Sequence, residues 1–259
     1  MRKILESSEF KKIKHHRTLF FSSNGICLGK NNDTPFISFE HGLSYFNIQS
    51  VIEDDNTLIV QGILSPDAPF HIISSKDCLR NVPPTDQNIL LRAIHLVELD
   101  SRTNHCTICS GILRFVRDAA EKKCSLCTKS FFPSLAPAVM VLIQREKDIL
   151  LARSPHFTPG MYIAIAGFID IGESAEAAAI REVREEVGLK ICNLKYFCTQ
   201  SWPFPSSFMI AFTTEYDGGE ICMDPLEIED ARWFAKDKLP DLPPMPSIAR
   251  TLIESVLSS

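Results

Sequence analysis

The residues best suited to chemistry lie in one stretch, Gly167 to Leu189, where a glycine-bearing loop runs into a helix-forming sequence. Glu182, Glu185 and Glu186 have the i, i+3 and i+4 spacing that brings side chains to one face of a helix. Glu173, in the loop before the helix, is a candidate fourth carboxylate. Because hard divalent cations such as Mg2+ or Mn2+ take oxygen ligands and bridge to phosphate oxygens, this cluster indicates metal-assisted phosphoryl chemistry.

The helix that must carry these carboxylates has recognisable ends. Ser174 is a favoured N-cap residue and Gly188 tolerates the left-handed C-cap, so the helix is predicted to run to Val187. Three like charges near its C-terminal end repel one another and oppose the helix dipole, which favours a bound cation. The alternative is a solvated helix face on which Arg181 pairs with Glu185. An apolar stripe is expected to face a core and consists of Ile180, Val183 and Val187.

The full spacing favours the metal-binding interpretation. It reads G-x5-E-x7-R-E-U-x-E-E-x-G-U, with U an aliphatic residue, and is met by Gly167, Glu173, Arg181, Glu182, Val183, Glu185, Glu186, Gly188 and Leu189. This pattern resembles the Nudix box of hydrolases that cleave nucleoside diphosphates linked to another moiety. The resemblance implies an α+β fold, an α/β/α sandwich with a mixed sheet, in which Arg181 orients a glutamate. It also implies three metal ligands on the helix, Glu182, Glu185 and Glu186.

A second pattern involves four of the nine cysteines. Cys106-x2-Cys109 and Cys124-x2-Cys127 are separated by 14 residues, a spacing typical of two zinc knuckles that present four thiolates to one ion. Four sulfur ligands leave no open position for chemistry, so one structural Zn2+ per chain is expected. The alternative is four free thiols in a reducing compartment.

The composition is that of an ordinary globular chain with room for one large domain or two modest ones. A net charge of -5 over 259 residues argues against a broad basic surface and extensive nonspecific nucleic-acid binding. No apolar run approaches the roughly 18 residues of a membrane-spanning helix, and the N-terminal sequence lacks the apolar core of a signal peptide. A cytoplasmic location and no membrane partner are therefore expected.

The chain is expected to comprise three domains: a small, mainly β domain over residues 1–101, a zinc ribbon over 102–134 and a hydrolase domain over 135–259. The basic run from Lys11 to Arg17, with its paired histidines His15 and His16, is interpreted as solvated and not as a phosphate contact. In the first domain, strands and one helix are predicted over residues 18–21, 57–64, 70–73 and 87–99.

The segment Thr199 to Ser207, TQSWPFPSS, narrows the interpretation. It resembles the S-Q-P-W-P-F-P-x-S array that follows the Nudix box in NADH pyrophosphatases, with Thr199 in place of Ser and Ser201 in place of the first Pro. Prolines on both sides of Phe204 stiffen the loop, and a rigid aromatic-polar loop suits nucleotide recognition. The alternative is a core turn that buries its aromatic rings. Candidate substrate-binding residues are Gln200, Ser201, Trp202, Pro203, Phe204, Pro205, Ser206 and Ser207.

The resemblance to NADH pyrophosphatases runs from Cys106 to the C-terminus and implies further site residues. Glu227 would bind metal or substrate, and Ala166 would offer its backbone carbonyl to the metal. Ala249 would make a backbone contact to substrate. Phe168 falls where an aromatic ring would stack on the nicotinamide.

More distant positions are also implied. Phe132, which replaces the usual Tyr, would supply a second stacking ring from the partner subunit of a homodimer. Arg80 stands at the place of a substrate arginine. The stretch from Asp118 to Glu121 departs from the Thr-Glu pair and glycines of the family, so the resemblance does not extend to the substrate contact of this segment.

These residues together predict an Mg2+- or Mn2+-dependent pyrophosphatase that splits NADH, and also NAD+, into a nicotinamide mononucleotide and AMP. Water is the expected nucleophile, and one of the helix glutamates or Glu227 would accept its proton. The same chemistry on ADP-ribose, a dinucleoside polyphosphate or the NAD cap of an RNA remains open. So does an inactive Nudix scaffold whose zinc ribbon binds RNA or a protein.

Overall fold

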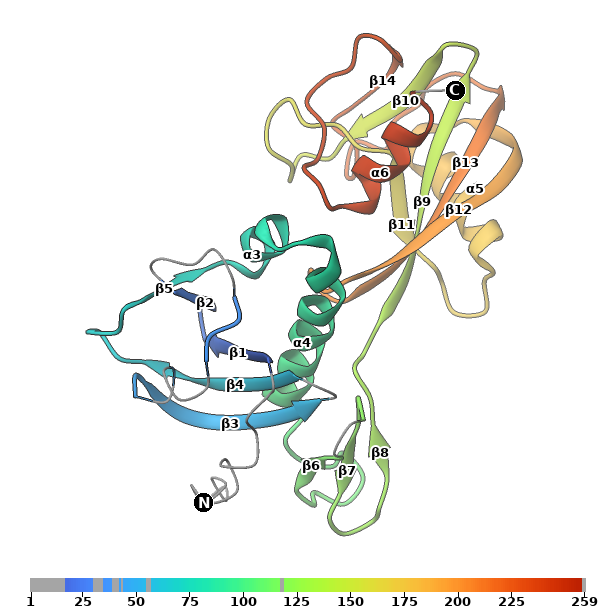
Figure 1. The fold of residues 1–259 in the computed structure, drawn as a ribbon. Coiled ribbons are helices and arrows are strands. Elements are labelled where there is room, and N and C mark those ends of the chain that lie inside the picture. The colour runs from blue at the N-terminus through green and yellow to red at the C-terminus, as the bar shows by residue number, and fades with distance from the viewer. Residues whose placement is uncertain are drawn as a thin grey trace. The chain divides into compact units, whose positions relative to one another are not determined.

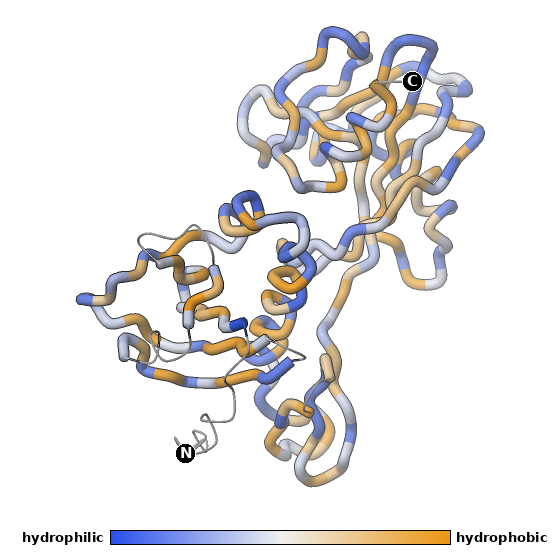
Figure 2. Tube along the Cα trace, in the orientation of Figure 1, coloured by the Kyte–Doolittle hydropathy of each residue, from blue (hydrophilic) through white to orange (hydrophobic). Residues whose placement is uncertain are grey.

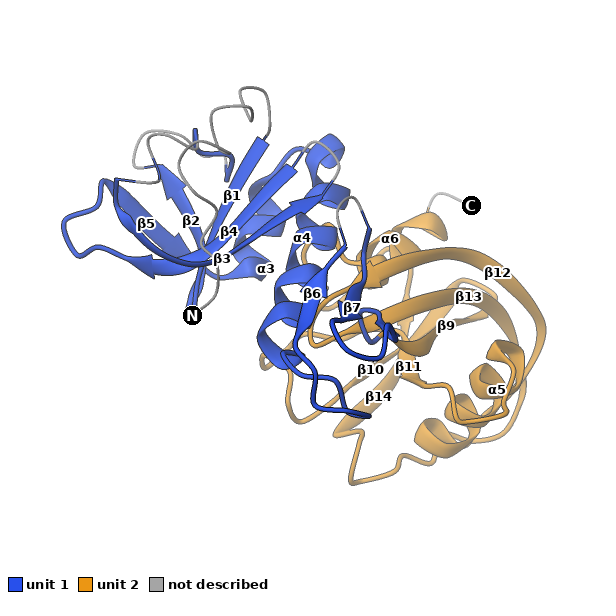
Figure 3. Ribbon diagram, turned by 90° about the horizontal axis from the view of Figure 1, so that it is seen from below, with its two compact units in different colours: residues 1–134 blue, residues 135–259 orange. Residues whose placement is uncertain are grey.

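The structure is a computed structural model that describes residues 17–29, 35–38, 42, 44–54, 57–116 and 119–257. The chain divides into two compact units, Met1–Ser134 and Leu135–Ser259 (Figure 3). The basic run as far as His16 lies outside the described residues, and so does Asp118. Within the described part of the chain, no helix combines the length and the apolar character needed to cross a bilayer.

The first unit contains a five-stranded sheet in the order β3-β4-β1-β2-β5 (Figure 1). β1 and β4 run parallel, and the other neighbours run antiparallel. The strands predicted over 57–64 and 70–73 are confirmed with those bounds, whereas β2 and β3 were not predicted. The strands are β1 Arg17–Ser22, β2 Gly25–Gly29, β3 Phe46–Asp54, β4 Thr57–Leu64 and β5 Phe70–Ile73.

Two helices follow this sheet. α3, Ser75–Asn81, was not predicted; it begins where the hydroxyl of Ser74 accepts a hydrogen bond from the N–H of Asp77. α4, Pro84–Arg102, contains the predicted helix over 87–99, and apolar and polar residues alternate around it (Figure 2). Leu90, Ala93 and Leu96 of α4 are buried, as their helical spacing predicts.

The cysteine segment forms a three-stranded antiparallel sheet from β6 Leu113–Phe115, β7 Lys122–Cys124 and β8 Ser130–Phe131. Lys122 is buried, and its Nζ lies 2.5 Å from Oδ1 of Asp100 at the end of α4. The other oxygen of Asp100 accepts hydrogen bonds from Ser50 on β3 and Gln61 on β4. This buried ion pair therefore joins the cysteine segment to the helix and sheet before it. A separate domain over 102–134 stays a prediction.

The second unit is built on a mixed six-stranded sheet in the order β12-β13-β9-β10-β14, with β11 paired to β9. Only β13 and β9 are parallel neighbours among the described strand pairs of this sheet. The strands are β9 Ala136–Arg145, β10 Asp148–Arg153, β11 Ile165–Phe168, β12 Lys190–Trp202, β13 Ser207–Gly218 and β14 Asp230–Ala235.

One helix covers each face of this sheet. Successive residues of a strand point to opposite faces, so β9 divides its apolar side chains between two cores. Val139, Val141 and Ile143 lie in the core under α5, Ala175–Val187. Ala138, Met140 and Leu142 lie in the core under α6, Ile248–Ser255. The expected α/β/α sandwich is confirmed, and the unbroken apolar run of β9 is explained by burial on both faces.

Candidate active site

The helix that carries the glutamates has the predicted ends. The hydroxyl of Ser174 accepts a hydrogen bond from the N–H of Ala177 at 3.1 Å, and Gly188 closes the helix with φ of 73°. Val183 and Val187 are completely buried in the core, as the apolar stripe requires, but Ile180 is exposed and does not belong to it. The buried face fixes the rotation of α5, and thereby the direction in which its carboxylates point.

Three carboxylates converge at this site, from two different segments. Oxygen atoms of Glu182, Glu186 and Glu227 lie within 4.8 Å of one another, and the two helix residues are buried. Glu182 packs against the backbone of Gly167 so closely that a Cβ atom there would lie 2.0 Å from the Glu182 carboxyl carbon. The first glycine of the motif is therefore required by close approach of a carboxylate.

Glu227 reaches the cluster because its loop is hydrogen-bonded to the end of α5. The N–H of Asp224 donates to the carbonyl of Glu186 at 3.1 Å, and the N–H of Cys222 donates to that of Val187 at 3.0 Å. The Asp224 carboxylate accepts the N–H of Leu226 at 2.9 Å, and its carbonyl accepts the N–H of Glu227 at 3.2 Å. Asp224 thus shapes the turn that positions Glu227. The sequence analysis missed this role because Asp224 is one of several acidic residues in its segment and no motif distinguishes it.

Arg181 holds the surrounding carboxylates in place. Its Nε and Nη2 donate to the two oxygens of Glu173 at 2.9 and 2.8 Å, and Nη1 donates to Glu182 at 2.7 Å. Nη2 also donates to the carbonyl of Phe168 at 2.9 Å. The predicted role of Arg181 agrees with this geometry, because a forked, charge-assisted pair fixes both direction and distance.

Glu185 is placed differently from the prediction. The spacing rule put all three helix glutamates on one face, but only Glu182 and Glu186 belong to the converging group among the described residues. Glu185 is exposed and accepts a hydrogen bond from Arg181 at 2.9 Å, the pairing that the alternative interpretation described. Glu185 is four positions after Arg181, and side chains at this i, i+4 spacing meet on a helix surface, so Arg181 binds this carboxylate. A metal-ligand role for Glu185 stays a prediction.

Burial and mutual repulsion shift the pKa values of the carboxylates in this cluster. Burial, together with the charges of Glu182, Glu227 and Asp224, raises the pKa of Glu186 to about 8. Burial also raises the pKa of Glu182, even though Arg181 opposes the shift. The hydrogen bonds from Arg181 lower the pKa of Glu173. A cation bound between the glutamates would favour the ionised forms that are costly here.

A cleft of about 300 Å³ adjoins this cluster. Ala166, on β11 next to Gly167, lines it together with Glu186 and Glu227. Ala166, whose carbonyl is predicted to bind the metal, therefore lies beside the carboxylate cluster. Metal binding by this carbonyl stays a prediction. Two buried carboxylates and one exposed carboxylate beside a cleft fit a hard divalent cation that takes oxygen ligands.

The TQSWPFPSS segment forms the end of β12, a turn and the start of β13. Its two rings contact each other edge to face, with the centroids of Trp202 and Phe204 5.1 Å apart. Trp202 also packs against the core under α6, so part of the alternative core interpretation applies to it. Pro203 and Ser207 are buried, Pro205 is exposed, and Ser201 and Ser206 are half-buried.

Gln200 has a role that the sequence did not indicate. Its Nε2 donates to the carbonyl of Pro246 at 2.7 Å, and its Oε1 accepts the N–H of Ile248 at 2.7 Å. The side chain therefore fastens β12 to the start of α6, beside the buried Ala249. Phe168 is exposed next to the glycine of the motif, as a stacking ring requires. The substrate contacts predicted for these residues are untested.

Two predicted substrate residues lie in the first unit. Phe132 is exposed after β8, with 65% of its surface accessible. Arg80 is exposed on α3, and its Nη1 pairs with Oδ1 of Asp77 at 2.8 Å. Their predicted contacts to substrate are likewise untested.

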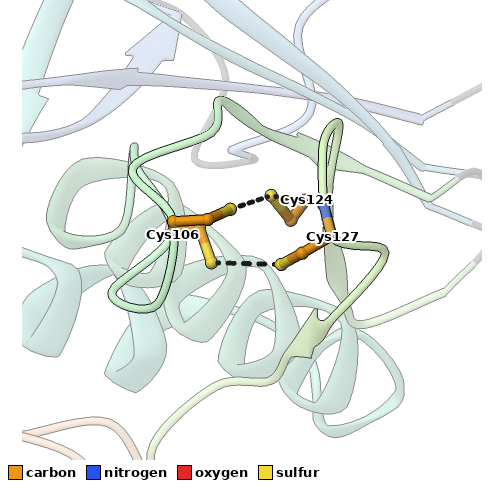
Figure 4. A group of neighbouring side chains, drawn as sticks. Cys106, Cys124 and Cys127 are labelled. Carbon is orange, nitrogen blue, oxygen red and sulfur yellow. Dashed lines mark hydrogen bonds between the residues drawn. The ribbon is translucent and has the colours of Figure 1, made fainter.

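The four cysteines converge as predicted. Their sulfur atoms lie within 4.8 Å of one another, with Cys106 to Cys127 at 3.6 Å and Cys109 to Cys124 at 3.4 Å (Figure 4). Four sulfurs at the roughly 2.3 Å bond length of a tetrahedral zinc site would be roughly 3.8 Å apart, close to these separations. None of the four is in a disulfide.

The two knuckles have the same backbone design. Ser110 and Thr128, each directly after the second cysteine of its pair, have φ of 58° and 59°. In the first knuckle the N–H of Cys106 donates to the carbonyl of Gly111 at 2.8 Å, and in the second the N–H of Cys124 donates to that of Lys129 at 2.9 Å. Amide N–H groups of Cys127 and Leu126 donate to the sulfur of Cys124 and lower its pKa to about 6. The N–H donors of the second turn stabilise the thiolate of Cys124, and the set of four sulfur atoms fits Zn2+.

Comparison with known proteins identifies the family of this chain. The NUDIX domain family matches residues 134–256. "NAD-capped RNA hydrolase NudC" of Chromobacterium violaceum is 45% identical over 178 residues, which are 69% of this chain and 67% of that protein. The protein of the same name from Stutzerimonas stutzeri is 37% identical over 234 residues, 88% of this chain and 81% of that protein.

A solved structure, a NUDIX hydrolase from Nitrosomonas europaea, has a TM-score of 0.47 and 20% identity, covering 60% of this chain and 89% of that one. The family match includes the glutamate helix, Gly167 and Glu227, and the Stutzerimonas stutzeri protein is similar over most of the chain. The chain is therefore a Nudix hydrolase and belongs to the NADH pyrophosphatase family, which includes the NAD-capped RNA hydrolases.

Proposed function

We propose that this enzyme hydrolyses the diphosphate of NADH and NAD+, giving NMNH or NMN and AMP, and that it also removes the NAD cap from RNA. The relatives named NAD-capped RNA hydrolase support this activity. A free dinucleotide and an NAD cap present the same diphosphate, so a site built around the phosphates accepts both. The single observation that supports this most strongly is the convergence of Glu182, Glu186 and Glu227 beside a cleft.

In this proposal the three carboxylates hold Mg2+ or Mn2+. A bound cation of this kind neutralises charge on the diphosphate and lowers the pKa of water. Arg181 keeps Glu182 and Glu173 in fixed positions through its 2.7 to 2.9 Å hydrogen bonds. Glu227 or one of the helix glutamates accepts the proton of the attacking water.

The remaining parts of the chain take supporting roles. The four cysteines hold one structural Zn2+. The enzyme acts in the cytoplasm, where thiols stay reduced and are able to bind zinc. Phe168, Trp202 and Phe204 contact the ring systems of the substrate. The exposed Phe132 stacks on the substrate bound to a second copy in a homodimer. An inactive scaffold is disfavoured, because the whole carboxylate set is present with the arginine that positions it.

The test is metal-dependent turnover of NADH, NAD-capped RNA and ADP-ribose, measured side by side with Mg2+, with Mn2+ and with a chelator. We expect turnover of NADH and release of the cap, both lost with the chelator. The Glu186→Gln variant is the matched control for a contaminating hydrolase. Turnover of ADP-ribose alone would replace the proposed substrates, and no turnover of any substrate would favour a binding scaffold.

A further inference from the structure

The cleft beside the carboxylates has a wall to which no role has yet been assigned. It is contributed by the loop over residues 154–160, SPHFTPG, which follows β10. His156 and Phe157 of this loop line the same cleft as Ala166, Glu186 and Glu227. Leu226, the neighbour of Glu227, lines it as well.

Both ends of this loop are fastened to the segment that follows Glu227. At the first end, Nη2 of Arg153 lies 2.5 Å from Oε1 of Glu229, and the Arg153 carbonyl accepts the N–H of Glu229 at 2.8 Å. At the second end, the hydroxyl of Tyr162 donates to the carboxylate of Asp230. These contacts fix the position of the loop relative to the Glu227 carboxylate.

The loop itself is also ordered. The N–H of Phe157 donates to the carbonyl of Ser154 at 3.1 Å, and the N–H of His156 approaches the Ser154 hydroxyl at 3.4 Å. Pro155 and Pro159 restrict φ on both sides of these residues. A side chain on such a turn loses little entropy when it contacts a ligand, which makes it suitable for recognition.

The chemistry of this wall matches a nucleoside phosphate. Among the described residues that line the cleft, Glu186 and Glu227 are acidic, and His156 is the only side chain able to carry a positive charge. Imidazole N–H groups are good donors to phosphate oxygens. Phe157 offers a ring face, and Leu226 is 84% exposed, so packing within the fold does not account for its position.

We propose that His156 donates a hydrogen bond to a phosphate oxygen of the substrate, and that Phe157 and Leu226 contact the nucleoside attached to that phosphate. These residues would then determine substrate affinity, separately from the TQSWPFPSS segment. This inference rests on the proposed function for its substrate class, a nucleotide diphosphate. Beyond the proposed function, it assigns the wall of the cleft a contact with one of the two mononucleotide halves of the substrate.

The test compares His156→Ala, His156→Gln, Phe157→Ala and, as a matched control on the same loop, Thr158→Ala, whose side chain does not line the cleft. AMP binding is measured by calorimetry in the presence of Ca2+, and NADH turnover is measured with Mg2+. We expect His156→Ala to weaken AMP binding about 10-fold and to lower kcat/KM by about 10-fold to 100-fold, the range of a charge-assisted hydrogen bond. His156→Gln keeps an N–H donor and should recover most of the loss.

Phe157→Ala should raise KM for NADH about 10-fold and leave kcat nearly unchanged, because stacking is present in both the ground state and the transition state. Thr158→Ala should behave as the wild type in both assays. Equal AMP binding in His156→Ala and Thr158→Ala would overturn the inference, as would absence of AMP binding to the wild type. Normal AMP binding that His156→Ala weakens, combined with no NADH turnover by the wild type, would instead contradict the proposed function.

Discussion

Gly167 lies directly against the carboxylate of Glu182. A Cβ atom at this glycine would be 2.0 Å from the carboxyl carbon and 2.2 Å from each oxygen of Glu182. Gly167 lies on β11, which pairs with β9. The backbone at Gly167 cannot move away from Glu182 without breaking hydrogen bonds between these two strands. The carboxylate would have to move instead.

Gly167→Ala should therefore leave the fold intact and lower kcat by about 100-fold, the usual cost of a misplacement of about 1 Å at a catalytic group. The measurement is NADH turnover at saturating Mg2+, with circular dichroism to establish that the protein is folded. Glu176→Gln, an exposed substitution in the first turn of α5, is the control. Wild-type activity in Gly167→Ala would show that the position of Glu182 is not critical.

Glu186 makes the stability of the metal-free enzyme depend on pH. Its pKa is about 8 in the folded protein against an ordinary value of 4.5, so the protonated form favours the folded state. Stability contributed by this group is fully present below pH 4.5 and is lost as the pH rises through about 8. In a chelator, the melting temperature should fall from pH 5 to pH 8.5 more steeply for the wild type than for Glu186→Gln.

The same variant should lose most of its kcat, because a ligand charge is removed while the shape is kept. Added Mg2+ should flatten the pH dependence of the wild type by favouring the ionised carboxylates. Parallel melting curves for the two proteins across this pH range would contradict the assigned role of Glu186.

Arg181→Lys tests the forked arrangement of the cluster. A lysine keeps the charge but cannot donate to both oxygens of Glu173 and to Glu182 in a fixed plane. We expect kcat to fall by about 10-fold to 100-fold, in line with the loss of one charge-assisted hydrogen bond worth about 1.5 to 3 kcal/mol. Arg184→Lys on the same helix is the matched control and should retain full activity. Equal kcat values for the two variants would remove the positioning role of Arg181.

The zinc site predicts a defined metal content. Metal analysis of the purified protein should find about one Zn2+ per chain, and Cys124→Ser should reduce it. Lys122, two residues before Cys124, forms a buried ion pair with Asp100, so zinc loss should also destabilise the first unit. Native thiol titration that finds all nine cysteines reactive would contradict the site.

Features set by local sequence were predictable. Ser174 and Gly188 define the ends of α5 through backbone preferences of single residues, and the two C-x2-C turns impose their geometry within six residues. β4 and β5 were predicted with correct bounds because apolar runs end at turn residues. The strands β2 and β3, and the helix α3, lack such clear periodicity.

Features that depend on distant partners were not predictable. Gln200 is bound to Pro246, 46 residues later, and Lys122 to Asp100, 22 residues earlier. The spacing of Glu185 places it near the other glutamates, but spacing does not reveal that Arg181 competes for it. The family resemblance predicted Glu227 as a site residue. The turn at Asp224 that positions Glu227, and the place of His156 in the cleft wall, depend on the folded structure and could not be predicted.

The most direct test of metal-dependent diphosphate cleavage is mass spectrometry of the products formed from NADH in water enriched in oxygen-18. If the glutamate cluster acts on the diphosphate, the products are NMNH and AMP, one of them carries a single heavy oxygen on its phosphate, and no nicotinamide is released. Both products should disappear in the chelator and in Glu186→Gln. Nicotinamide together with an ADP-ribose product would contradict the account, because that cleavage breaks the glycosidic bond and does not involve the phosphates at all.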